Sequence, residues 1–313
     1  MTDPQPLVKP AASAASSNPS PGAIGPEAYT RWRATTLGAV TQALEHRLLH
    51  QLIGVVQGKH VLDLGCGDGL LTAALAERGA RAVGIDIDRA MLCAAVARTD
   101  PGQREPARFA EGRLEQLPFR DAMFDVVVAV TVLCLLSDEA IAVREAARVL
   151  RPGGRLIIGD LGRWNAWAAR RRIKGWFGSR LWRSAHFSTA GDLSRLVERE
   201  GLTVEAVRGS VYYPPMGVLA RALAPLDHWL GAVTTIGAAF IAVSATKRAH
   251  DGSQKEYASG TWMRLHTSGS VPLSTMRNWC TTFGRPRGAA DFRRAGILAI
   301  ATLTLLGLRL ATA

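Results

Sequence analysis

Apolar residues follow two alternating patterns along the central part of the chain. Short runs of consecutive apolar residues, typical of strands buried on both faces, occur at 60–65, 80–87, 123–133 and 155–161. Residues with helical spacing lie between them, at 68–79, 89–99 and 138–150, together with a strand-like stretch at 107–113. This alternation predicts an α/β fold, a doubly wound and mostly parallel Rossmann-like sheet with helices on both faces.

The same patterns set the bounds of the expected domain. Apolar residues at helical spacing between 27 and 56 predict one or two helices ahead of the first strand. After the fifth strand comes a basic, Trp-rich segment, 163–187, followed by a helix at 190–200 and strands at 203–213 and 237–247. We therefore expect one domain over 27–247, with 163–187 as an insertion.

The two ends of the chain lack such periodicity. Residues 1–26 contain six prolines and no apolar segment of a signal peptide, so we expect them to be disordered. Residues 248–313 form a basic tail rich in Ser, Thr, Gly and Arg, which we also expect to be poorly ordered, and it ends in a hydrophobic segment, 295–313. Arg309 leaves only 14 uncharged residues in that segment, fewer than the roughly 18 of a spanning helix. A membrane anchor and an amphipathic or disordered end remain alternatives.

Charge and cysteine content narrow the range of partners. There are 38 Lys and Arg against 26 Asp and Glu, a net charge of +12, which favours anionic partners without defining a fold. The four cysteines have neither metal-ligand nor disulfide-framework spacing, so the sequence predicts free thiols, no metal site and a cytoplasmic protein.

The stretch "VLDLGCGDG" (61–69) carries the first chemical signal. A strand that runs into closely spaced glycines and then a helix brings its backbone close to a ligand. The dinucleotide fingerprint G-x-G-x-x-G fails here, because its third glycine position is Leu70. Asp63, just before the turn, would repel a pyrophosphate but suits a ligand with an ammonium and a sulfonium group.

A second carboxylate, Asp86, ends the next strand, 23 residues after Asp63. A carboxylate at this position accepts hydrogen bonds from both hydroxyls of an unphosphorylated ribose. Asp63 and Asp86 together predict S-adenosylmethionine (SAM) as the cofactor.

Four segments resemble, in order and spacing, the class I SAM-dependent methyltransferases, in particular the group with the ubiquinone/menaquinone C-methyltransferases. They are "HVLDLGCGDG", "AVGIDIDRAML", "LPFRDAMFDVVV" and "EAARVLRPGGRLII", and the resemblance covers about 27–247. It implies a seven-stranded sheet and transfer of a methyl group from SAM to a small-molecule acceptor. The residues it places at the cofactor are Asp63, Gly65, Cys66, Gly67, Asp86, Ile87, Met91, Arg113, Leu114, Glu115, Val130 and Thr131.

Two positions depart from the family pattern. Members commonly carry Asp where Arg113 stands, and an arginine cannot accept a hydrogen bond from the adenine amino group. Glu111, Glu115 or a backbone carbonyl would then take over, or packing alone would hold the adenine. The family often has His in place of Cys134. Three residues also have ordinary alternatives: Asp63 as a helix N-cap, Asp86 as a solvated turn carboxylate, and Met91 as core packing.

Residues at the acceptor are less defined by the sequence. Tyr29 and His186 are candidates for a general base, and Trp32 and Tyr212 for contact with the acceptor. The segment 163–187 holds seven Lys or Arg, four Trp and no acid. Three interpretations of this segment stay open: a solvated basic helix with buried Trp, a lid for an anionic or aromatic (or lipid-like) acceptor, or an interfacial helix on an acidic membrane. The C-terminal segment is a second candidate for that membrane contact.

Other classes of function stay open at this point. Nucleic acid is a disfavoured partner, because no RNA-binding module is recognisable and basic plus aromatic composition does not read bases. A non-catalytic SAM-binding subunit is the first alternative to an enzyme, and a NAD-dependent oxidoreductase is the second. The oligomeric state is not defined by the sequence.

Overall fold

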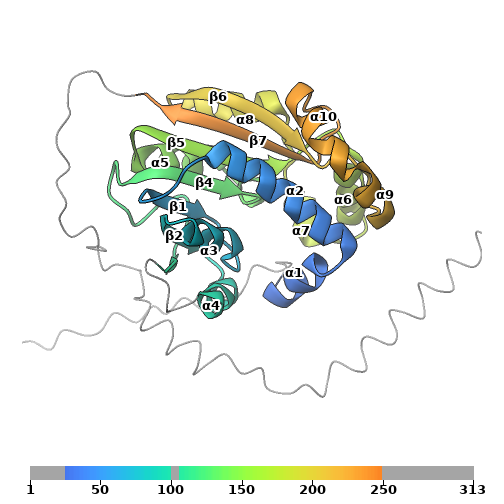
Figure 1. Cartoon of the computed structure of the whole chain (residues 1–313), viewed down its shortest axis with the longest axis horizontal. Helices are drawn as coiled ribbons and strands as arrows, with labels where there is room; N and C mark the ends of the chain where they lie inside the picture. The colour runs from blue at the N-terminus through green and yellow to red at the C-terminus, as the bar shows by residue number, and fades with distance from the viewer. Residues whose placement is uncertain (1–24, 100–105, 249–313) are drawn as a thin grey trace, which may run out of the picture. The chain divides into compact units, whose positions relative to one another are not determined.

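A computed structural model describes residues 25–99 and 106–248 of the chain (Figure 1). Its centre is a seven-stranded sheet in the order β3-β2-β1-β4-β5-β7-β6, in which β7 runs antiparallel to both of its neighbours. The strands are β1 (His60–Leu64), β2 (Arg81–Asp86), β3 (Arg108–Glu111), β4 (Phe124–Val130), β5 (Leu150–Leu161), β6 (Leu202–Ser210) and β7 (Phe240–Lys247). The predicted mostly parallel, doubly wound fold is therefore confirmed.

Helices connect the strands and include several that the sequence pattern did not predict. The helices are α1 (Pro26–Arg33), α2 (Thr36–Ile53), α3 (Leu70–Glu77), α4 (Arg89–Arg98), α5 (Glu139–Val149), α6 (Ala166–Trp176), α7 (Arg180–Ser184), α8 (Ala190–Arg199), α9 (Gly217–Leu223) and α10 (Asp227–Val233), with 3₁₀ turns η1 (Leu133–Leu135) and η2 (Ala224–Leu226). No helix was predicted between 213 and 237. The apolar residues of α9 and α10 are mostly exposed, so they give no periodic buried face to recognise.

The two faces of the sheet are covered by different helices. Alternate strand residues, such as Leu62 and Val127, form one cluster with the apolar faces of α5 and α8. The helix α2 packs over β5, β6 and β7, and Figure 1 shows it crossing the sheet on the near side. The carboxyl ends of β1, β2, β4 and β5 consequently meet at one edge between these layers, which is where open α/β sheets bind ligands.

Local capping fixes where the helices at this edge begin. Asp88 accepts hydrogen bonds from the backbone N–H groups of Ala90 and Met91 at the start of α4. Asn165 does the same for Ala168 in α6. Such caps satisfy N–H groups that the helix leaves free, each contributing about 1 kcal/mol.

Several expectations from the sequence concern the ends of the chain. The predicted disordered segment 1–26 and tail 248–313 lie outside the described residues, apart from Gly25, Pro26 and Arg248. In the part of the chain that is described, every helix is too short or too polar to cross a bilayer. Cys66 and Cys134 are free and buried as expected, whereas the expectation of a free thiol is wrong for Cys93, which is disulfide-bonded.

Candidate active site

The three glycines between β1 and α3 all adopt the left-handed conformation, but their surroundings differ. Their φ angles are 66° at Gly65, 54° at Gly67 and 73° at Gly69. A Cβ at Gly65 would collide with Val132, and one at Gly69 would lie 2.6 Å from the Cβ of Ala95. A Cβ at Gly67 would meet no protein atom within 4 Å. Packing thus explains two of the glycines, and the third presents bare backbone to open space, as a ligand-binding turn requires.

Asp86 is fixed beside this turn by backbone hydrogen bonds. Its Oδ2 accepts from the N–H of Gly67 and its Oδ1 from the N–H of Asp88, both at 2.8 Å. Burial raises the pKa of the half-buried carboxyl, and these two hydrogen bonds oppose that rise. Each oxygen keeps a further lone pair for a ligand hydroxyl. The next side chain, Ile87, is 51% exposed and offers an apolar surface beside it.

Asp63 lies behind the turn and is only 2% exposed. The hydroxyl of Thr72 donates to its Oδ2 at 2.6 Å. Burial, together with the nearby charge of Asp86, raises its pKa to about 7 although the Thr72 hydrogen bond opposes this. The alternative role as N-cap of α3 is wrong, because that position is taken by Gly69.

Cys66 contributes its backbone to the turn, while its side chain points inward. The side chain is buried, and a Cβ on Gly84 of β2 would lie 2.8 Å from its Sγ. Burial raises the pKa of the thiol well above its usual value. A buried, protonated thiol is a packing group and not a nucleophile.

A cluster of ion pairs, which the sequence pattern did not reveal, connects α1 to the glycine turn. The guanidinium of Arg33 forms two hydrogen bonds with the carboxylate of Asp68, one of them at 3.1 Å, and Arg98 of α4 donates to the same carboxylate at 2.8 Å. Burial alone would raise the pKa of Asp68, but the two arginines hold it below its usual value. The helix α1 is thereby held over the edge of the sheet.

The structure places α1 aromatic residues at the end of β4. The side chain of Thr131, which follows Val130 and has a φ of 49°, lies near the hydroxyl of Tyr29 and opposes the rise that burial causes in the pKa of Tyr29. Trp32 packs edge-on against the ring of Tyr29, with the ring centroids 6.1 Å apart. Tyr29 and Trp32, predicted near the acceptor, therefore lie beside Val130 and Thr131, which were predicted near the cofactor.

Both acidic residues considered as substitutes at the adenine position are paired with arginines. Arg89 Nε lies 2.5 Å from Glu111 Oε2, and Arg113 lies 3.2 Å from Glu115. Leu114, between Arg113 and Glu115, is buried. The adenine can instead be held by a backbone carbonyl or by packing against Ile87 and the half-buried Met91. Neither of these alternatives requires an existing ion pair to be broken.

A second unforeseen cluster lies at the carboxyl ends of β4 and β5, around Arg171 of α6. Its Cζ is 4.9 Å from the ring centroid of Trp182 and 5.4 Å from that of Trp167. Within residues 25–99 and 106–248 its guanidinium makes no hydrogen bond and no ion pair. Burial lowers its pKa, while the charges of Glu45 and, more weakly, of Tyr29 and Asp160 oppose this.

Two carboxyl groups face this arginine without a direct contact. Burial raises the pKa of Glu45 in α2 to about 7, with Arg171 opposing and Asp227 adding to the rise. Asp160, at the end of β5, is 1% exposed, and burial raises its pKa to about 6. Its Oδ1 accepts from the N–H of Leu161, but its buried Oδ2 has no hydrogen-bond partner. An unpaired buried acceptor of this kind is uncommon in folded proteins, where a water molecule, an ion or a ligand donor usually satisfies it.

The remaining candidates are placed differently. His186 is exposed, and its backbone N–H donates to the carbonyl of Cys134 at 2.8 Å. The hydroxyl of Tyr212 donates to the carbonyl of Thr234, and its N–H donates to Asp227. Tyr212 thus joins β6 to α10 and does not meet the Arg171 cluster. Cys134 packs in a small core with Leu161 and lies against Asp160.

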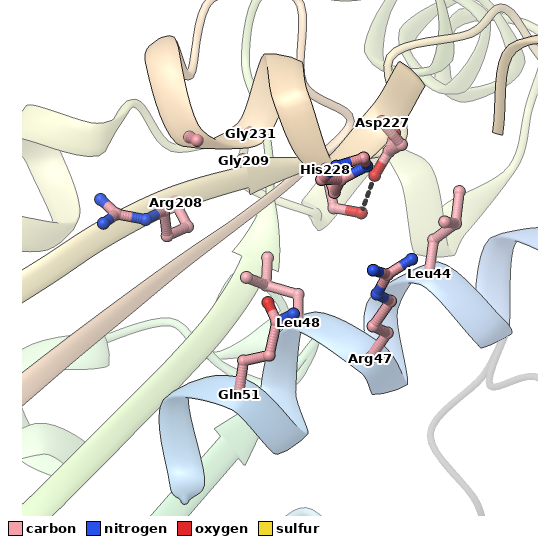
Figure 2. Close-up of a pocket in the computed structure, with 11 residues that line it drawn as sticks. Leu44, Arg47, Leu48, Gln51, Arg208, Gly209, Asp227, His228 and Gly231 are labelled. Atoms are coloured by element: carbon pink, nitrogen blue, oxygen red, sulfur yellow. Dashed lines mark hydrogen bonds between the residues drawn. The ribbon is translucent and has the colours of Figure 1, made fainter. Parts of the chain in front are cut away.

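A separate pocket lies between α2, the end of β6 and α10 (Figure 2). Arg47, Arg208 and His228 are among its lining residues. Its buried carboxylate, Asp227, already accepts hydrogen bonds from the hydroxyl of Ser210 at 2.6 Å and from the N–H of Tyr212 at 3.1 Å. These bonds fasten α10 to β6 and leave the pocket without an unsatisfied buried group, so we place the candidate site at the glycine turn instead.

Comparisons with known proteins show similarity to methyltransferases. A family model described as a methyltransferase domain matches residues 62–158. An uncharacterized protein of Mycobacterium tuberculosis is 31% identical over 235 residues, which are 74% of this chain and 76% of that protein. A ubiquinone biosynthesis O-methyltransferase of Idiomarina loihiensis is 30% identical over 51% of this chain and 68% of its own length.

Solved structures show the same fold at low sequence identity. Magnesium protoporphyrin IX methyltransferase of Synechocystis, solved with bound S-adenosylhomocysteine, superposes with a TM-score of 0.52 at 18% identity, covering 70% of this chain and 92% of that one. A SAM-dependent methyltransferase of Thermotoga maritima gives a TM-score of 0.51 at 21% identity, covering 71% and 96% of the two chains.

Proposed function

Because the chain belongs to the class I SAM-dependent methyltransferases, we propose that it methylates a small-molecule acceptor that carries an anionic group. The observation that carries the proposal is the guanidinium of Arg171, which lies over two indole rings at the same sheet edge as the glycine turn and makes no hydrogen bond or ion pair within the described residues. The Idiomarina loihiensis relative, named a ubiquinone biosynthesis O-methyltransferase, supports an oxygen nucleophile on that acceptor.

The residues at the glycine turn fit SAM. Gly67 leaves room for close approach of the ligand, and Asp86 keeps lone pairs for two ribose hydroxyls. Asp63 suits the ammonium group, and Ile87 and Met91 suit the adenine face. When bound, SAM supplies a methyl carbon attached to a positively charged sulfur. The protein then has to position the acceptor and exclude water, which are the main contributions to such a displacement.

The Arg171 cluster supplies the groups that position the acceptor. Arginine binds a carboxylate through two parallel N–H donors, and cation–π contacts with Trp167 and Trp182 restrict the movement of the Arg171 guanidinium. The unpaired Oδ2 of Asp160 would accept a hydrogen bond from the acceptor. Glu45, with a pKa of about 7, can take up a proton from an acceptor hydroxyl at neutral pH, and Tyr29 and His186 remain rival candidates for that role.

The test is methyl transfer from labelled SAM to the small molecules of a cell extract. In the Arg171→Met variant, we expect about tenfold to hundredfold less product at limiting acceptor, because the charge-assisted contact with the anionic group, in total about 1.5–3 kcal/mol, is lost. SAM affinity should not change. Arg170→Met is the matched control, since Arg170 is an exposed neighbour on the same helix.

Two outcomes would contradict the proposal. Equal turnover by the Arg171→Met variant and the unchanged protein would show that Arg171 does not bind an anionic group of the acceptor. SAM binding without product from any extract fraction would favour the alternative of a non-catalytic SAM-binding subunit. A NAD-dependent oxidoreductase, the remaining alternative, has no support from the family or from the glycine turn.

We also expect SAM affinity to depend on pH through Asp63. Because the pKa of this carboxyl is about 7 in the free protein, it must lose a proton before it can pair with an ammonium group. Affinity should therefore be highest just above pH 7, where Asp63 is ionised and the ammonium group of SAM is still protonated, and fall by up to about tenfold per pH unit below it. Calorimetric titration at several pH values measures this, and Asp63→Asn should flatten the profile. A flat profile for the unchanged protein would rule out the assigned role of Asp63.

A further inference from the structure

Large apolar side chains are exposed mainly in two segments of the chain. Of the 15 such side chains in the described residues, 12 lie within 164–177 and 216–236. These 12 are Trp164, Ile173, Trp176, Phe177, Met216, Val218, Leu223, Leu226, Trp229, Leu230, Val233 and Ile236. Several are more than two-thirds exposed, among them Phe177 at 86% and Val233 at 84%. So many apolar groups in two short segments mark an interaction site.

The two segments are joined along α6. At its start, Asn165 donates to the carbonyl of Ala238 at 2.8 Å, which places Trp164 next to the end of the second segment. Further along, the indole N–H of Trp167 donates to the carbonyl of Tyr213 at 2.8 Å. Figure 1 shows α6, α9 and α10 at the same end of the sheet. We call the exposed side chains of 164–177 and 216–236 the α6–α10 surface.

The charge around this surface has one sign. Residues 162–187 and 211–236 contain eight Lys or Arg and a single acid, Asp227. Asp227 is buried and already accepts two hydrogen bonds, so it offers no exposed negative charge. Arg170, Lys174 and Arg221 are exposed beside the apolar groups. Tryptophan and basic side chains next to exposed aliphatic ones are typical of helices that lie in a membrane interface.

We propose that the α6–α10 surface docks on an anionic phospholipid bilayer. The apolar side chains enter the interface, and the basic side chains contact the acidic headgroups. A symmetric interface between two copies would place the same basic residues against each other, which disfavours a second copy as the occupant. The proposal concerns where the protein binds and does not depend on methyl transfer. It extends the membrane contact predicted for 163–187 to helices α9 and α10.

Co-sedimentation of the full chain with vesicles tests the proposal. We expect binding to phosphatidylcholine vesicles that contain phosphatidylglycerol, weaker binding as salt rises, and little binding to phosphatidylcholine alone. A triple variant, Trp229→Ser with Val233→Ser and Ile236→Ser, should lose about tenfold or more in partitioning, because three exposed side chains no longer enter the apolar phase. Val55→Ser is the matched control: Val55 is 74% exposed and follows α2, outside this surface.

Unchanged melting temperature and SAM affinity would show that the triple variant is folded. Several results would overturn the proposal. The first is equal vesicle binding by the triple variant and the control, which would place the contact elsewhere, for example at 295–313. The second is equal binding to neutral and anionic vesicles. The third is no vesicle binding together with a dimer that the triple variant abolishes.

Discussion

Replacing Gly67 with alanine is expected to weaken SAM binding about tenfold or more while the fold stays intact. The new Cβ meets no protein atom within 4 Å, so the folded protein loses only the strain of a left-handed alanine, about 1–2 kcal/mol. The same methyl group would occupy the space in which we place the ligand. A large effect on binding with a small effect on stability is thus specific to a ligand-binding role for this glycine.

Gly69→Ala is the matched control for that experiment. Its Cβ would lie 2.6 Å from the Cβ of Ala95 and 2.8 Å from the ring of Phe109, so overpacking adds about 1–3 kcal/mol to the same backbone strain. We expect Gly69→Ala to lower the melting temperature clearly more than Gly67→Ala does. If Gly67→Ala binds SAM as well as the unchanged protein, the turn does not approach the cofactor.

Replacing Asp86 with asparagine should weaken SAM binding about a hundredfold. Two charge-assisted hydrogen bonds to ribose hydroxyls become neutral ones, and one amide oxygen cannot accept from both while also accepting the N–H of Gly67. The substitution also replaces one of the two carboxylate oxygens that accept hydrogen bonds from the N–H groups of Gly67 and Asp88. Titration calorimetry measures the loss.

Asp88→Asn controls for the removal of a charge at this position. Asp88 caps α4 through the N–H groups of Ala90 and Met91, and asparagine is an equally good N-cap. Its SAM affinity should stay close to that of the unchanged protein. Equal losses in the Asp86 and Asp88 variants would mean that long-range charge, not ribose contact, explains the effect.

Local sequence patterns were sufficient for the sheet and for the position of the glycine turn. Strands β1, β2, β4 and the second half of β5 are short apolar runs, and Asp63, Gly67 and Asp86 stand at or just after strand ends whose alignment follows from the parallel order. The pattern could not say which glycine faces a ligand. That distinction depends on Val132, Ala95 and Phe109, which come from three other parts of the chain.

The acceptor side of the site could not be predicted for a related reason. Glu45, Asp160 and Arg171 are each more than 10 residues apart in the sequence and come from α2, β5 and α6. No periodic pattern links such groups. The Arg33–Asp68 pairing, which holds α1 over the turn, likewise joins residues 35 positions apart. Within 163–187 the sequence allowed buried or interfacial Trp, and the structure shows Trp167 buried and Trp176 at 80% exposure.

Calorimetric titration of the full chain with SAM and, separately, with NAD tests the central claim most directly. The claim is that the turn after β1 and Asp86 form a SAM site. We predict one SAM bound per chain, a loss of about a hundredfold in Asp86→Asn, and no heat from NAD. Binding of NAD without binding of SAM would contradict the account.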